Sequence, residues 1–156
     1  MGDIMAAPGG MIAQTIQLAL APVFVLVAMG NIMNILSTRL ARVVDRSRHL
    51  QQQHLETQGA DHDQVVREIR ILDRRIHLIT RSITLLVLTG LAIGFCVALL
   101  FVEELLDVNL QQVAGAAFFL AIGLLMGALW VFLREIRLAT TALRIPEMYL
   151  ELERKL

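Results

Sequence analysis

The sequence predicts an all-α integral membrane protein in which three transmembrane helices are combined with a long antiparallel helical hairpin. Two observations lead to this prediction. Three long stretches carry no charged side chain, and all the basic residues lie in only two of the segments outside these stretches. The composition agrees, since 56% of the residues are hydrophobic and 18% are charged, whereas soluble domains average about 45–50% and about 25%. We expect the whole chain, 1–156, to form a single membrane domain.

The three uncharged stretches each supply the roughly 20 apolar residues that a helix needs to cross a bilayer core about 30 Å thick. A cleaved signal peptide is the alternative for the first stretch. A signal peptide has a positive first region and a short apolar run, but residues 1–10 carry only Asp3 and the apolar run is long. We therefore expect the first stretch to remain in the protein, and predict spans at about 11–36, 82–102 and 113–133.

The basic residues predict the orientation of these spans. Segment 37–81 holds nine arginines, and segment 134–156 holds four arginines and Lys155, which together are all 14 basic residues. Segments rich in arginine and lysine stay in the cytoplasm. The N-terminus is therefore predicted outside, and segment 37–81 and the tail 134–156 are predicted in the cytoplasm.

Segment 37–81 is predicted to be a helical hairpin that continues the first two spans. Its apolar side chains recur at spacings typical of helices and would pack between two arms of about 20 residues each. The periodicity stops near Gly59, and Asp61 followed by Gln64 has the pattern of a helix-capping sequence. The apolar positions are Leu36, Leu40, Val43, Leu50, Val65, Ile69, Leu72, Ile76, Ile79 and Ile83.

Arginine side chains also recur at helical spacing on the other side of these helices, where they form one-sided basic stripes. Such a stripe is either a solvated surface or a surface that binds anionic lipid headgroups or another anionic ligand. The use of arginine in place of lysine suits bidentate contact with phosphate. The candidate basic and ion-pair residues are Arg39, Arg42, Asp45, Arg46, Arg67, Arg70, Arg74, Arg81, Arg134 and Glu135.

The first span contains amide side chains, which need polar partners inside a membrane. Two interpretations stay open: hydrogen bonds between helices of one protomer, or a polar path at the centre of a homo-oligomer. The amides are Gln14, Gln17, Asn31 and Asn34.

Small residues recur at a spacing of four in the second and third spans, which lets helix backbones approach closely. We expect these two spans to contact each other through these residues. They are Gly90, Gly94 and Ala98 in the second span, and Gly123 and Gly127 in the third.

Catalysis has little support in the sequence. No Asp, Glu, Lys, Arg or His lies inside a span, and Cys96 has no base beside it in an apolar helix, although a nucleophile needs one. The cluster Asp61, His62 and Asp63 offers too few ligands for a structural or catalytic metal. We therefore expect no enzyme, no catalytic residue, no metal and no cofactor, and no nucleic acid as a partner.

Four segments, 20–24, 38–46, 74–84 and 132–144, together resemble a family of small bacterial membrane proteins described as domain of unknown function 2721. The resemblance implies a multi-pass protein of the bacterial inner membrane with three spans, and it implies no catalytic or binding residue. It marks the cytoplasmic boundary of the membrane as the place of the family motif. The motif residues there are Arg39, Arg42, Asp45, Arg46, Arg81, Arg134 and Glu135.

Two functions fit these observations. The first is a homo-oligomeric, channel-like assembly that passes ions or small solutes. The alternative is a membrane scaffold or regulatory subunit whose basic hairpin binds anionic lipid or a cytosolic protein partner. Membrane lipid is an expected partner in both.

Overall fold

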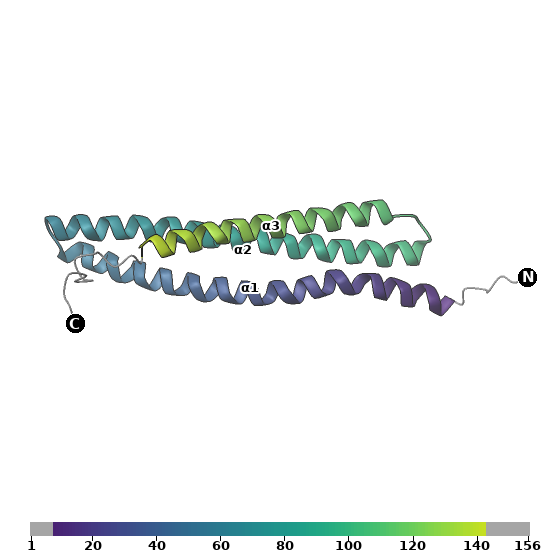
Figure 1. The fold of residues 1–156 in the computed structure, drawn as a ribbon. Helices are drawn as coiled ribbons and strands as arrows, with labels where there is room; N and C mark the ends of the chain where they lie inside the picture. Colours follow the sequence, from purple (N-terminus) through teal and green to yellow (C-terminus); the bar gives the residue numbers. More distant parts are fainter. Residues whose placement is uncertain (1–7, 143–156) are drawn as a thin grey trace, which may run out of the picture.

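In the part of the chain that the structure describes, the fold consists of three long helices joined by two short connections (Figure 1). The computed structural model describes residues 8–142, with side chains from residue 16 to residue 140. Helix α1 is Pro8–Glu56, α2 is Ala60–Leu106 and α3 is Gln111–Ala142. Each helix is long and apolar enough to span a membrane, and each contains one of the predicted spans. The all-α prediction is confirmed, and the last part of the predicted tail, 143–156, lies outside the described residues.

Helix α2 is the central element of the bundle. It packs against both α1 and α3, whereas α1 and α3 contact each other much less. All neighbouring helices run antiparallel, and the joined ends of α1 and α2 extend beyond the end of α3 (Figure 1). Residues 37–81 are therefore helical except at the connection between α1 and α2.

The connection between α1 and α2 turns at Gly59. Its φ of 67° and ψ of −136° are open to glycine and costly for other residues. Gly59 is also the residue before the first turn of α2, and its carbonyl accepts a hydrogen bond of 3.2 Å from the backbone N–H of Asp63. The predicted cap by Asp61 is therefore wrong: the glycine turns the chain earlier, and Asp61 lies inside the first turn, where its charge complements the helix dipole.

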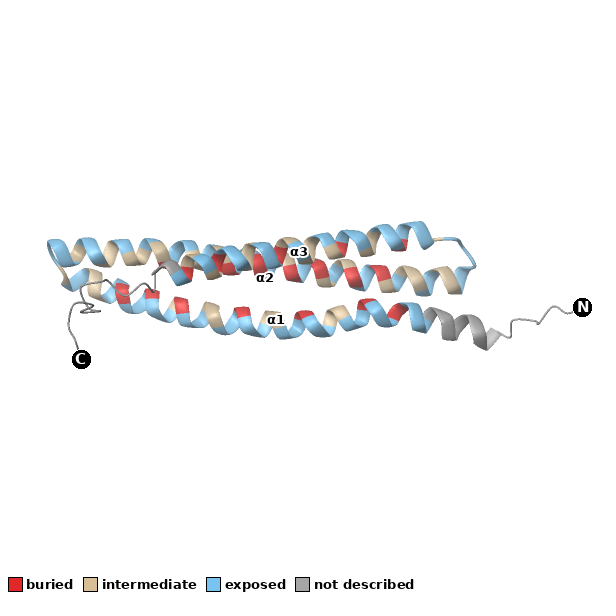
Figure 2. Cartoon of the chain, viewed as in Figure 1, coloured by how far each residue is buried: buried red, intermediate tan, exposed pale blue. Residues whose placement is uncertain are grey.

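Buried side chains recur every seven residues in each helix, which gives the banded pattern of Figure 2. A seven-residue repeat keeps the same seam facing the neighbouring helix in a left-handed coiled-coil packing. The predicted apolar positions of the hairpin all belong to this core or pack against it. The repeats are Met29, Leu36, Val43 and Leu50 in α1; Leu72, Ile79, Leu86 and Ile93 in α2; and Ala114, Ala121, Ala128 and Glu135 in α3.

A second buried repeat on α2, Ser82, Thr89 and Cys96, forms the seam with α3. The thiol of Cys96 donates to the carbonyl of Ala114, with a Sγ–O distance of 3.3 Å. In this antiparallel register the small hydroxyl residues of α2 fall opposite the buried alanines of α3. Small side chains on both sides let the two backbones approach closely, which is how membrane helices gain packing energy.

The glycines predicted at this seam mostly lie elsewhere. Gly94 and Gly123 are exposed and have open space where a Cβ would be, and Ala98 is exposed as well. A Cβ on Gly90 would lie 3.6 Å from Met29, so Gly90 faces α1, and only Gly127 lies near α2. The prediction fails because a spacing of four drifts around the helix, whereas the observed seam follows a spacing of seven.

Candidate functional site

Glu135 joins all three helices through its carboxylate. Its side chain is fully buried. Oε2 accepts a hydrogen bond of 3.0 Å from Nη1 of Arg39 on α1. Oε1 accepts bonds of 3.1 and 3.0 Å from Nε and Nη2 of Arg75 on α2. We call these three residues the Glu135 cluster.

The heptad pattern explains how the chain brings this cluster together. Glu135 continues the buried alanine repeat of α3, and Arg75 lies seven residues before Ser82 and so continues the small-residue repeat of α2. The Cys96–Ala114 and Arg75–Glu135 contacts are 21 residues apart on both helices, which is three heptads. The α2–α3 seam therefore ends in an acid and a base that face each other.

Arg39 reaches the cluster from α1 across an aromatic ring. Its guanidinium carbon lies 5.5 Å from the ring centroid of Phe132, within the range of a cation–π contact. Arg39 lies three residues after Leu36, and Glu135 two residues after Leu133. The cluster thus sits at the edge of the apolar spans, where a buried carboxylate is stable only when cations pair with it.

A cavity of about 330 Å³ lies beside the cluster, and we call it the arginine groove. Four of its lining residues are arginines, and the others are apolar except for one threonine. The Arg46 guanidinium is paired with Glu68 on α2, at 2.8 Å. Arg42 is exposed and has no hydrogen bond or ion pair with any described residue. The lining residues are Arg39, Arg42, Val43, Arg46, Leu72, Arg75, Ile136, Ala139 and Thr140.

The structure brings part of the predicted basic set together. Arg39, Arg42, Arg46 and Glu135 meet at the arginine groove, and Asp45 lies 4.0 Å from Arg48 on the outer surface. The remaining candidates are exposed and form no ion pair within the described part of the chain. They are Arg67, Arg70, Arg74, Arg81 and Arg134.

Arg75 is the site residue that the sequence interpretation missed. The available signal was its position seven residues before Ser82, on the line that continues through Thr89 and Cys96. Without knowledge that this line packs against α3, Arg75 looks like one more member of the exposed basic stripe.

The described amide side chains of the first span form no hydrogen bond with the other helices of the chain. Gln17, Asn31 and Asn34 are all exposed, and their side chains form no hydrogen bond with a described residue. The side chain of Gln14 lies outside the described residues. Of the two interpretations of these amides, hydrogen bonding inside one protomer therefore gains no support.

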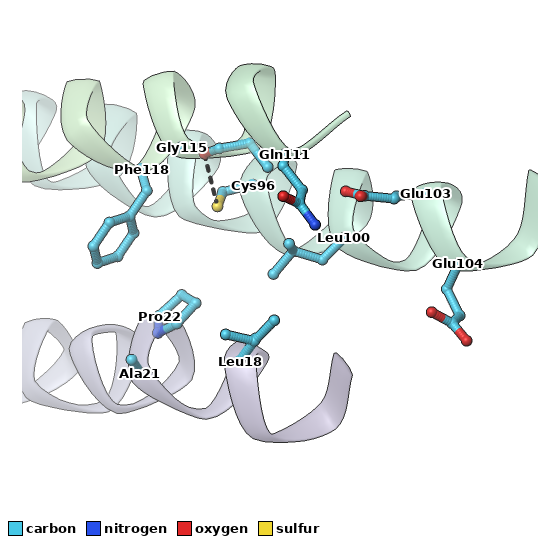
Figure 3. A pocket seen from close by; sticks show the side chains of 11 residues that line it. Leu18, Ala21, Pro22, Cys96, Leu100, Glu103, Glu104, Gln111, Gly115 and Phe118 are labelled. Carbon is cyan, nitrogen blue, oxygen red and sulfur yellow. Dashed lines mark hydrogen bonds between the residues drawn. The ribbon is translucent and has the colours of Figure 1, made fainter. Parts of the chain in front are cut away.

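A second cavity, of about 570 Å³, lies at the opposite end of the bundle. Figure 3 shows Leu18 and Pro22 of α1 on one side of it, and Leu100 and Phe118 of α2 and α3 on the other. The lining is mainly apolar, with two glutamates near the end of α2. The full set is Leu18, Ala21, Pro22, Cys96, Leu100, Glu103, Glu104, Gln111, Ala114, Gly115 and Phe118.

Within residues 16–140, no group of three or more His, Cys, Asp or Glu side chains is placed to hold a metal ion.

Three apolar helices with their charges gathered beyond the apolar stretches indicate a helical membrane protein. The family described as "Protein of unknown function (DUF2721)" matches residues 19–145, and the chain belongs to this family. The resemblance found in the sequence is thereby confirmed. The matched range includes the Glu135 cluster and the arginine groove. No curated protein and no solved structure matches the chain.

Proposed function

We propose that copies of this protein associate through α1 into a homo-oligomeric, channel-like assembly that passes ions or small solutes across the bacterial inner membrane. The observation that carries this proposal is the set of exposed amides on α1. Gln17 and Asn31 lie within the apolar stretch and have no side-chain hydrogen-bond partner among the described residues.

An amide without a hydrogen-bond partner is costly in hydrocarbon, so these side chains need water or another chain beside them. Gln17 and Asn31 are 14 residues apart, which is about four helical turns and about 21 Å. Ala21 and Ala28, also exposed, lie between them on the same side of α1. This strip of small and polar side chains suits either close helix contact between copies or a water-filled path.

The test combines oligomeric state with conductance. Native mass spectrometry of the purified protein should detect an oligomer, and planar bilayers should show currents. The Gln17→Leu and Asn31→Leu variants should weaken both, because the strip loses its polar groups. Gln112→Leu, an exposed amide at the start of α3, serves as the matched control. A monomer, or an oligomer without any conductance, would contradict the channel-like function.

The alternative function is a scaffold or regulatory subunit, and a different observation favours it. Arg67, Arg70 and Arg74 project from α2 beyond the apolar span, are exposed, and have no ion-pair partner among the described residues. They suit an anionic membrane surface or an acidic protein partner in the cytoplasm. Replacing all three with glutamate should abolish binding to anionic vesicles or to a co-purifying partner while the helical content stays unchanged. Unchanged binding would exclude this function.

A further inference from the structure

We propose that the arginine groove binds a phosphate group, either that of an anionic phospholipid or that of a soluble phosphate compound. The proposal rests on the alternative function above, to which it gives a site and a ligand group. It concerns residues other than the exposed arginines 67, 70 and 74, so the two can fail separately.

The groove holds more positive than negative charge. Four guanidiniums line it, whereas Glu135 and Glu68 are the only described carboxylates paired with them. Arg42 has no partner among the described residues. Arg39 gives only one of its N–H groups to Glu135, so most of the five donors of its guanidinium remain available for a ligand. An anion in the groove would therefore find both an uncompensated charge and free donors.

Three of the four arginines are held in place before any ligand binds. Glu135 fixes Arg39 and Arg75, and Glu68 fixes Arg46. Ordering these long side chains in advance lowers the entropy lost on binding. Guanidiniums arranged in this way match the geometry of phosphate oxygens, which accept paired N–H bonds.

The size of the groove fits a phosphate with a substituent. Its volume of about 330 Å³ is about ten times the roughly 30 Å³ that one water molecule occupies in the liquid. Val43, Leu72 and Ile136 supply apolar surface within the same lining. A phosphate ester can therefore place its charge on the arginines and its organic part against these side chains.

The depth of the groove fits a lipid headgroup. The polar layer on each side of a bilayer is about 5–8 Å thick beyond the hydrocarbon core. Arg39 and Arg42 follow Leu36, the last residue of the first apolar stretch, by three and six residues, which is about 4.5 and 9 Å along the helix. Both guanidiniums are thus within reach of lipid phosphates, because long arginine side chains extend along the membrane interface.

The experiment compares two variants that each remove one positive charge. Arg42→Gln changes the groove at a residue without a described partner, so we expect its helical content and melting temperature to match those of the original protein. Arg67→Gln is the matched control on the exposed face of α2. Binding is measured by native mass spectrometry in detergent with three probes: phosphatidylglycerol, diacylglycerol, which lacks the phosphate, and inorganic pyrophosphate.

We expect phosphatidylglycerol to bind the original protein and the Arg67→Gln variant with equal affinity, and the Arg42→Gln variant at least tenfold more weakly. Diacylglycerol should bind none of the three proteins. If pyrophosphate shows this pattern and phosphatidylglycerol does not, the phosphate site stands and its ligand is soluble. The proposal is overturned if both variants lose the same affinity for the phosphate probes. It is also overturned if Arg42→Gln binds both phosphatidylglycerol and pyrophosphate as tightly as the original protein does. If only the variant with glutamate at positions 67, 70 and 74 loses phosphatidylglycerol binding, the alternative function is supported, whereas the arginine groove is not the binding site.

Discussion

The two ends of the helical bundle hold α1 in different ways. At one end, Arg39 connects α1 to the buried carboxylate of Glu135, which α2 also binds through Arg75. At the other end, Leu18 and Pro22 of α1 line a cavity of about 570 Å³ together with residues of the other two helices (Figure 3).

The α2–α3 seam, in contrast, continues through the bundle from Cys96 and Ala114 at one end to Arg75 and Glu135 at the other. From this comparison we expect α2 and α3 to behave as one packed pair, and α1 to be attached more strongly at its charged end than beside the cavity. Three variants test this difference, beginning with the largest expected effect.

Glu135→Gln should have the largest effect. It keeps the shape of the side chain but leaves two guanidiniums facing each other without their shared anion. We expect the free energy of unfolding to fall by about 2–3 kcal/mol, since Arg39 and Arg75 keep some access to water and the full cost of an isolated buried charge does not arise. Titration with dodecyl sulfate in mixed micelles, followed by circular dichroism, measures this loss.

Glu68→Gln is the control for that variant, because its pair with Arg46 is partly exposed. Exposed pairs of this kind contribute up to about 1 kcal/mol. If the free energy of unfolding falls equally in the two variants, the Glu135 cluster does not stabilise the packing of the three helices.

Ala121→Leu should have an intermediate effect at the α2–α3 seam. Ala121 is fully buried, and a larger side chain would force the two helices apart, at a cost of about 1–3 kcal/mol. Ala116→Leu, at an exposed position on α3, should leave stability nearly unchanged. The same micelle titration compares them, and similar stability of the two variants would contradict a close-packed seam.

Leu18→Ala should have the smallest effect. Leu18 lines the cavity and is 58% exposed, so its removal changes few packing contacts, and we expect a loss below about 0.5 kcal/mol. Leu86→Ala, at a fully buried position of the core, should cost about 2 kcal/mol or more. If Leu18→Ala lowers the free energy of unfolding as much as Leu86→Ala does, α1 is packed as closely beside the cavity as at its charged end.

Much of the fold could be predicted because it depends on patterns within single helices. Apolar length determines the spans, and apolar spacing determines which hairpin residues, such as Leu50 and Ile79, face inward. These patterns are local, so they can be recognised in the sequence without knowing which helices are neighbours.

The site was less predictable because it depends on which helix faces which. Glu135 and Arg39 were among the predicted candidates, but nothing in either helix alone indicated that Arg75 would complete their cluster. The small-residue pattern at Gly94 and Gly123 was assigned to the wrong surface for the same reason. The exposure of Asn31 likewise depends on α1 having a single close neighbour, α2.

The buried repeat of α1 passes from Met29 inside the apolar stretch to Leu50 in the hairpin without a change of phase. We therefore expect the hairpin and the spans to move together as one rigid unit, because α1 and α2 are unbroken helices between the tip near Gly59 and the spans. Its length can change only in whole heptads, about 10.5 Å at a time, if the phase is to be kept. A shorter insertion in one arm would rotate the tip relative to the membrane segment.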